Sequence, residues 1–178
     1  MTVREATRVT LVVALFVIVQ QTLMLDLRLG PVHPDIMILL PVVAGLIGGP
    51  GSGASMGFGA GLVADLFLPT PFGLSALVGC IIGFTVGITT LALDRTAGWL
   101  PPVAAFGASA LYVVIYAVLG SVLGQPQMIH VDLTQVVLMV SLVNALLALP
   151  AMRLVGWALP AASTEGVPTS TVSTGTLR

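Results

Sequence analysis

The feature that most constrains this chain is a glycine-rich stretch in which the spacing between glycines is repeatedly four residues. The glycines at this spacing are Gly45, Gly49, Gly53, Gly57 and Gly61, followed by Gly79, Gly83 and Gly87. Within one helix, residues four apart lie on one face, and glycines there let a neighbouring backbone approach closely. In water each interior glycine costs a helix about 1 kcal/mol relative to alanine. In lipid the backbone has no other hydrogen-bond partner, so the helix persists. The pattern therefore indicates membrane helices that pack through glycine faces.

The composition leads to the same class of protein. Of the 178 residues, 57% are hydrophobic and only 7% are charged, and the mean hydropathy is +1.10. Soluble domains carry about 25% charged residues, so these residues cannot build a water-soluble surface. We therefore expect an all-α integral membrane protein. The net charge is −1 and the basic residues form no patch or stripe, which argues against a nucleic-acid partner.

The apolar segments predict six transmembrane helices in one domain, residues 1–159. The predicted spans are 9–25, 36–49, 54–68, 72–93, 100–123 and 133–152, with a turn at Pro50–Gly53 between the second and the third. The second and third spans hold 14 and 15 residues, against a usual requirement of about 17–25. They form either two short helices or a hairpin that dips into the membrane and returns. The tail, residues 160–178, is mostly Ser, Thr, Pro and Gly and is expected to be disordered.

The arginines predict the orientation of the chain in the membrane. With a cytoplasmic N-terminus, only Arg28 lies outside, and the arginines inside are Arg4, Arg8, Arg95, Arg153 and Arg178. This distribution satisfies the positive-inside rule. Trp99 and Trp157 fall near the cytoplasmic ends of their predicted helices, where interfacial tryptophans are common. We expect a multi-pass protein of the cell membrane with both termini, and the tail, in the cytoplasm.

Side chains that carry chemistry are scarce. His33 and His130 lie in the predicted outer loops, each two residues from an aspartate, Asp35 or Asp132. A mixed metal site is one interpretation of these pairs, and solvated loop residues are the favoured one. The single cysteine, Cys80, excludes an intrachain disulfide and a CxxC site and reads as a small buried hydrophobe. Serines and threonines within the spans have no base at helical spacing and read as backbone-bonding or helix-contact residues. We expect no enzyme, no cofactor and no metal.

Asp65 is the one carboxylate in the otherwise uncharged run from Ile36 to Leu93. It lies three residues from the end of its predicted span, about 4.5 Å along a helix. Three interpretations stay open: an interfacial carboxylate bonded to the turn before the next helix, a contact with a partner helix, or a proton or ion relay. Only Asn144 is clearly polar at mid-depth. The residues predicted to serve helix packing or partner contact are Gly57, Gly61, Asp65, Gly79, Gly83, Gly87 and Asn144.

Three stretches of the sequence resemble a known family when read in order. They are HPDIMILLPV, GFGAGLVADLFLPTPFGLSALVG and LVNALLALPAMRLV. Together they resemble MreD, a membrane component of the bacterial rod-shape and elongation machinery. The most specific piece is Gly57-Phe58 followed by Gly61-Leu62-x-x-Asp65-Leu66 and Gly73-Leu74-x-Ala76-Leu77. Pro34, Asn144 and Pro150 also match, and the resemblance covers roughly Val9 to Leu159.

The resemblance implies a non-enzymatic scaffold of the elongation machinery (the elongasome) in the bacterial plasma membrane. Such a scaffold binds the bitopic protein MreC and supports peptidoglycan synthesis and cell-shape control. Its contacts with the wall-synthesis glycosyltransferase and transpeptidase are indirect, and lipid surrounds it. The resemblance also implies a fold similar to the six-helix substrate-binding subunits of energy-coupling-factor vitamin transporters. On this interpretation Asp65 and the Gly57/Gly61 face are structural or contact a partner.

Two other functions are weighed against the scaffold. A substrate-capture subunit of an energy-coupling-factor transporter would share the architecture. Those subunits commonly carry Ala-x-x-x-Ala on the first helix, which Thr10 and Ala14 reproduce only imperfectly. An intramembrane enzyme or small transporter is disfavoured because paired polar groups are few.

Overall fold

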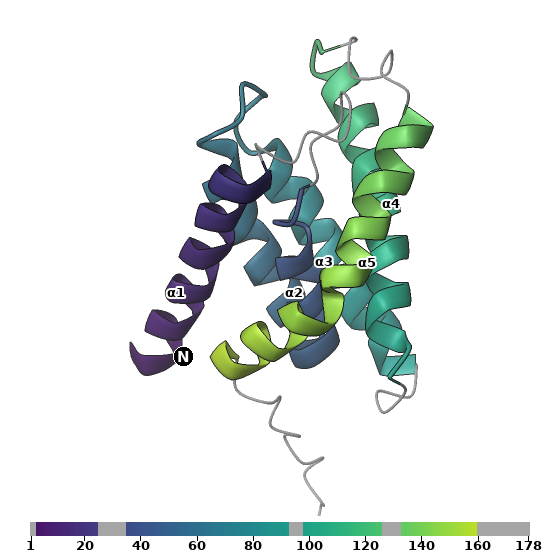
Figure 1. The fold of residues 1–178 in the computed structure, drawn as a ribbon. Coiled ribbons are helices and arrows are strands. Elements are labelled where there is room, and N and C mark those ends of the chain that lie inside the picture. The colour runs from purple at the N-terminus through teal and green to yellow at the C-terminus, as the bar shows by residue number, and fades with distance from the viewer. Residues whose placement is uncertain (1–2, 25–34, 93–97, 126–132, 160–178) are drawn as a thin grey trace, which may run out of the picture.

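The structure, a computed structural model, describes residues 3–24, 35–92, 98–125 and 133–159. These residues form helices and contain no strand (Figure 1). The elements are α1 (Val3–Val19), the π-helix η1 (Gln20–Met24), α2 (Leu39–Asp65), α3 (Leu74–Ala92), α4 (Leu100–Val122) and α5 (Leu133–Ala158). By length and composition, four of them, α2 to α5, could cross a membrane, with the two parts of α2 on either side of Gly49 counted together. The predicted all-helical class is confirmed for the described residues, and the coarse membrane assignment is supported by these four helices rather than by six.

The helix α2 is broken and reverses direction at one residue. Gly49 has φ +77° and ψ −170°, which is not helical. The first arm, residues 39–48, and the second arm, residues 50–65, fold back on each other. A Cβ atom added to Gly53 would lie 2.9 Å from the Cα atom of Gly45, although the two residues stand four positions on either side of Gly49. Residues 39–65 therefore form a helical hairpin.

This hairpin corrects the predicted spans 36–49 and 54–68. The break is confined to Gly49 instead of a turn over Pro50–Gly53, because Pro50 suits the first position of a helix and the second arm starts there. The second arm ends at Asp65 rather than at residue 68. The ten residues of the first arm span about 15 Å, roughly half the hydrocarbon thickness of a bilayer.

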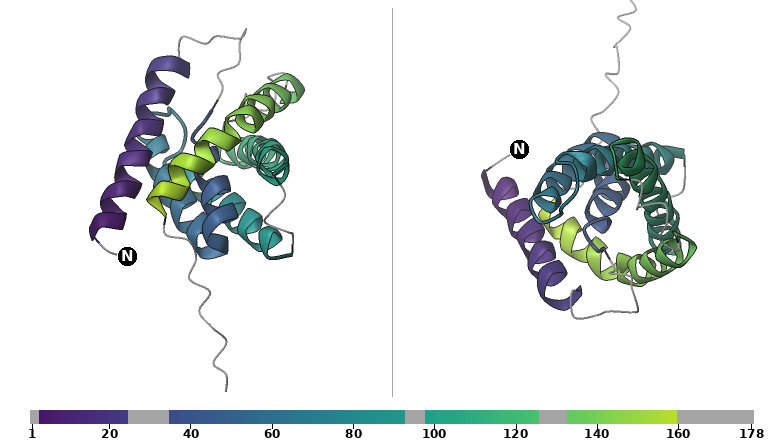
Figure 2. Two further views of the ribbon diagram at one scale, coloured as in Figure 1. Left: turned by 60° about the horizontal axis from the view of Figure 1, so that its bottom comes forward. Right: turned by 90° about the horizontal axis from the view of Figure 1, so that it is seen from above.

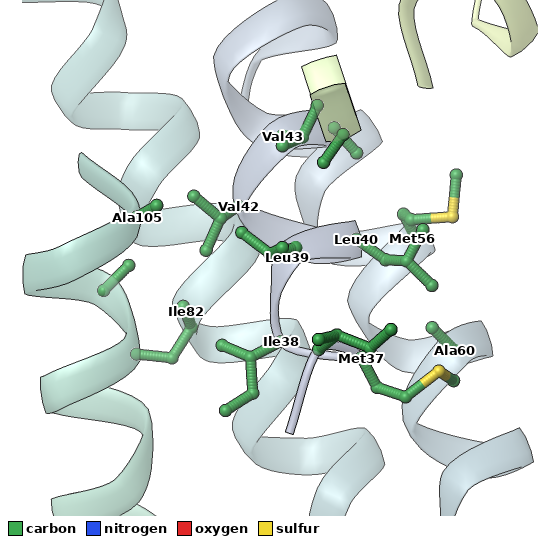
Figure 3. Close-up of a cluster of buried hydrophobic side chains, with 14 of the residues drawn as sticks. Met37, Ile38, Leu39, Leu40, Val42, Val43, Met56, Ala60, Ile82 and Ala105 are labelled. Carbon is green, nitrogen blue, oxygen red and sulfur yellow. The ribbon is translucent and has the colours of Figure 1, made fainter. Parts of the chain in front are cut away.

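Protein surrounds the first arm on every side. All residues from Ile36 to Leu46 are buried, and seen from above the other helices encircle this arm (Figure 2, right). In the close-up, Val42 points toward Ala105 of α4, and Leu40 points toward Met56 of the second arm (Figure 3). The arm therefore forms the centre of the hydrophobic core.

One end of α1 and one end of α5 extend beyond the predicted spans for one physical reason. α1 begins at Val3 instead of residue 9, and α5 runs to Ala158 instead of residue 152, past Pro150 and Arg153. The predicted ends followed the hydrophobic stretch, but a helix can continue into the interface because long charged side chains reach water there. α3 (Leu74–Ala92) falls inside its predicted range 72–93, and α4 ends one residue before 123.

α1 stands at the edge of the bundle (Figure 1). It is anchored by the buried side chains of Val12 and Phe16 and by Gln20, whose Oε1 accepts a 3.0 Å hydrogen bond from the Ile36 N–H. At the opposite end of α1, the guanidinium of Arg8 lies 5.0 Å from the Trp157 ring centre. The start of α1 and the end of α5 thus lie at the same end of the bundle.

Candidate functional site

The glycine rows of the second arm and of α3 face each other at backbone contact distance. A Cβ atom added to Gly57 would collide with the carbonyl group of Gly79, and one added to Gly53 would collide with that of Gly83. Gly61 meets the backbone of Ala76 in the same way. These pairs run antiparallel, and at Gly53, Gly57, Gly79 and Gly83 there is no room for a side chain larger than hydrogen.

The α3 glycine row serves the first arm of α2 as well as the second. A Cβ atom on Gly45 would lie 2.7 Å from the Gly83 carbonyl oxygen and 3.1 Å from the Gly87 nitrogen. Gly87 also contacts the backbone at Gly49 and Pro50. One glycine face of α3 therefore holds both arms of the hairpin, a sharing that the spacing alone did not reveal.

Asp65 caps the N-terminus of α3 from the last position of α2. Only 4% of it is exposed. Its Oδ2 accepts hydrogen bonds from the Gly73 N–H at 2.8 Å and from the Ala76 N–H at 3.4 Å, and its Oδ1 accepts one from the Ser75 N–H at 3.1 Å. The first N–H groups of a helix lack partners within the helix, and the helix dipole favours an anion there. Of the three interpretations left open for Asp65, the bonded carboxylate is the one with observed contacts.

Asn144 joins three parts of the bundle. Its side chain is fully buried, and its Nδ2 donates to the Asp35 carbonyl oxygen at 3.0 Å and to the Ser109 Oγ at 2.9 Å. It thereby ties α5 to α4 and to the segment that leads into the first arm of α2.

Asp35 is not a solvated loop residue, contrary to the favoured prediction. It is half-buried, and its Oδ1 accepts a 2.9 Å hydrogen bond from the Met37 N–H. Loss of hydration raises the pKa of this carboxyl to about 6, although the bond from Met37 opposes the shift. The sequence signal for this role was available, since Asp bonds its own backbone two residues on and so favours turns before helices.

The remaining polar residues of the prediction divide into three groups. Thr85, Thr89 and Thr90 donate to carbonyl groups one turn earlier, as expected. Ser109 instead accepts from Asn144, which sequence reasoning missed. His33, His130 and Asp132 lie outside the described residues. Within the described part of the chain, no group of three or more His, Cys, Asp or Glu residues is placed to hold a metal, and Cys80 is half-buried on α3.

A groove of about 600 Å³ separates α1 from the second arm of α2. Its walls include Val9 and Val13 of α1, and Ser55 and Gly59 of α2. Gly51, Ser55 and Gly59 form an exposed row of small residues at four-residue spacing, two positions out of phase with the buried row. A Cβ atom on Gly59 would meet nothing within 4 Å. The second arm thus has two small-residue faces, one filled by α3 and one open.

The described residues define a class: an all-helical bundle with helices long and apolar enough to span a membrane, assembled around a short hairpin held by glycine contacts. Compared with protein family models, curated proteins and solved structures, the chain matches none of them.

Proposed function

We propose that this protein is a non-enzymatic membrane scaffold of the MreD type. In this role it binds the single transmembrane helix of MreC in the bacterial plasma membrane, with both of its own termini in the cytoplasm. It thereby supports peptidoglycan synthesis and control of cell shape. The proposal rests on the resemblance of the sequence and on one structural observation, the open groove beside the second arm.

The groove has the properties that favour a transmembrane helix as occupant. In lipid, helices associate through close packing, and interfaces are enriched in small residues because these let backbones approach. Ser55 and Gly59 of the exposed row line the groove and offer such a surface. The opposite wall, from α1, contains the apolar residues Val9 and Val13 together with Glu5 and Thr10. The hydroxyl of Ser55 bonds the Ser52 carbonyl at 3.2 Å, so that it presents no unpaired donor to the groove.

A matched pair of glycines makes the proposal testable. Gly59→Leu adds a side chain in open space and should leave the protein folded while it fills the groove. Gly57→Leu, two residues away, drives the same side chain into the Gly79 backbone and should destabilise the fold by about 3 kcal/mol or more. Gly107→Leu is the control for an open glycine elsewhere, because a Cβ atom there also meets nothing within 4 Å.

The experiment is affinity purification of the tagged full chain from its native membrane in mild detergent, with the bound proteins identified by mass spectrometry. We expect MreC to accompany the wild type and the Gly107→Leu variant. We expect the Gly59→Leu variant to elute as a monodisperse, folded protein that has lost at least nine-tenths of its MreC, which corresponds to about 1.4 kcal/mol of binding energy.

Each other result has a defined meaning. MreC bound to Gly59→Leu at the wild-type level would place the contact elsewhere on the surface. Absence of MreC from the wild type would overturn the scaffold function. A transporter's membrane coupler and ATPases in the wild-type sample would support the alternative, a substrate-capture subunit of an energy-coupling-factor transporter.

A further inference from the structure

Three buried oxygen atoms in the bundle have no hydrogen-bond partner within the described residues. They are Ser75 Oγ, Ser141 Oγ and Asn144 Oδ1, on side chains that are at most 1% exposed. A buried polar atom without a partner costs about 1–3 kcal/mol. Buried polar groups in native proteins are therefore bonded to protein, water or an ion. Three such atoms in one bundle call for an occupant.

Two of the three atoms belong to α5, on which Asn144 contacts the segment that leads into the first arm of α2. Ser141 and Asn144 stand three residues apart on α5 and so share one face of that helix. Asn144 also holds the Asp35 carbonyl oxygen. Tyr112 of α4 lies within electrostatic range of Asp35 and also interacts with the Ser75 side chain. Asp35 therefore lies beside Asn144 and within range of Tyr112.

The carboxylate of Asp35 has no basic partner within the described part of the chain. Arg153 is nine residues beyond Asn144 on α5, about 13.5 Å along the helix axis. Arg8 stacks on Trp157, which is farther along α5 than Arg153. Arg4 lies one turn before Arg8 on α1. A desolvated carboxylate is costly unless it is compensated by a proton or a cation. The unpaired atoms of Ser141 and Asn144, on the neighbouring face of α5, are both oxygens.

We propose that Asp35, Ser141 and Asn144 form a binding site for a small, hard monovalent cation, Na⁺. Hard cations take carboxylate, amide, hydroxyl and backbone oxygens as ligands. A single carboxylate balances one positive charge, whereas divalent sites normally gather several carboxylates. Because the site joins α5 to the start of the first arm, bound Na⁺ stabilises the folded bundle.

The test is the thermal unfolding midpoint of the purified full chain in detergent, followed by the fluorescence of Trp99 and Trp157. NaCl is titrated at constant ionic strength against choline chloride, and LiCl and KCl are titrated in parallel. We expect a saturable rise of the midpoint with Na⁺, since a ligand that binds only the folded state stabilises it according to its concentration relative to Kd. Choline should give no rise.

The variants assign the effect to the site. Ser141→Ala removes one oxygen and should raise the half-saturating Na⁺ concentration by about tenfold, and Asp35→Asn should abolish the dependence on Na⁺. Ser121→Ala is the matched control, because its hydroxyl bonds the Val118 carbonyl at 2.7 Å near the end of α4. Equal shifts with all four salts, no shift with any, or an unchanged titration in Ser141→Ala would overturn the proposal. The last two results would assign the unpaired oxygens to water instead.

Discussion

At the scale of single residues, Asp65 performs two functions with one side chain. It is the last residue of α2, and its carboxylate accepts hydrogen bonds from the backbone N–H groups of Gly73, Ser75 and Ala76 at the start of α3. Gly73, with φ +96°, allows the chain to turn back toward it. One carboxylate therefore closes the turn between two packed helices and satisfies donors that water cannot reach.

The replacement of Asp65 distinguishes hydrogen bonding from charge. Asp65→Asn keeps one acceptor oxygen and should lower the free energy of unfolding by about 1 kcal/mol, whereas Asp65→Leu leaves three buried donors unpaired and should lower it by about 3 kcal/mol. Thermal unfolding in detergent measures the difference. Equal losses in the two variants would show that the charge itself is required.

The other polar residues show where prediction from the sequence stopped. Asp65 and Asn144 were recognisable because they interrupt apolar runs. The partners of Asn144 were not, because Asp35 is 109 residues away in the chain and Ser109 is 35 residues away. Residue spacing along one helix predicts only which residues share a face of that helix. These bonds depend on how α5 packs against α4 and against the segment before α2. Asp35 was read as a loop residue because its neighbour His33 suggested an exposed pair.

At the scale of elements, the hairpin of α2 depends on the backbone of one residue. Gly49 has φ +77° and ψ −170°, a region that is accessible essentially to glycine alone. A Cβ atom there would meet nothing within 4 Å. The constraint is therefore the conformation of the backbone and not a lack of space.

Gly49→Ala should accordingly destabilise the fold by about 1–3 kcal/mol. Gly51→Ala serves as the control, because Gly51 is helical, exposed and equally free of neighbours, and alanine there should be neutral or stabilise by up to about 1 kcal/mol. Unfolding midpoints of the two variants give the comparison. A neutral Gly49→Ala variant would mean that the reversal tolerates another backbone conformation.

The helices themselves were largely predictable, and their arrangement was not. Apolar length placed α3 and α4 to within two residues at each end, because lipid requires continuous helix wherever the chain is apolar. The same rule could not distinguish two short spans from a hairpin over residues 36–68. Both arrangements consist of apolar residues, and in both the chain reverses its direction. The second small-residue face, at Gly51, Ser55 and Gly59, was not predicted. The sequence does not show which of the two faces packs against α3 and which stays exposed.

At the scale of the whole molecule, α4 and α5 set the length of the bundle. They run antiparallel and meet at Ser109 and Asn144. From that contact, Val122 lies about 20 Å along α4 toward one end, and Gly156 lies about 18 Å along α5 toward the other. The two positions are thus separated by more than the hydrocarbon thickness of about 30 Å. The start of α1 lies with Gly156, because Arg8 contacts Trp157.

Cysteine labelling can test this arrangement in cells. In a Cys80→Ser background, single cysteines that replace Val3 and Gly156 should be accessible to a membrane-impermeant maleimide from the same side of the membrane. A cysteine that replaces Val122 should be accessible from the other side. With the proposed orientation, only the Val122→Cys variant is labelled in spheroplasts, and the other two are labelled after permeabilisation. Different responses at Val3 and Gly156 would contradict the placement of α1 beside the end of α5.

The burial of the first arm also has a consequence for biogenesis. Residues 39–48 are made early, yet their neighbours include Ala105 of α4, and Asn144 of α5 holds the residue just ahead of them. While the ribosome is still translating the second half of the chain, this arm has neither the length to cross the bilayer alone nor its neighbours from α4 and α5. The centre of the bundle is therefore completed only after α5 has entered the membrane.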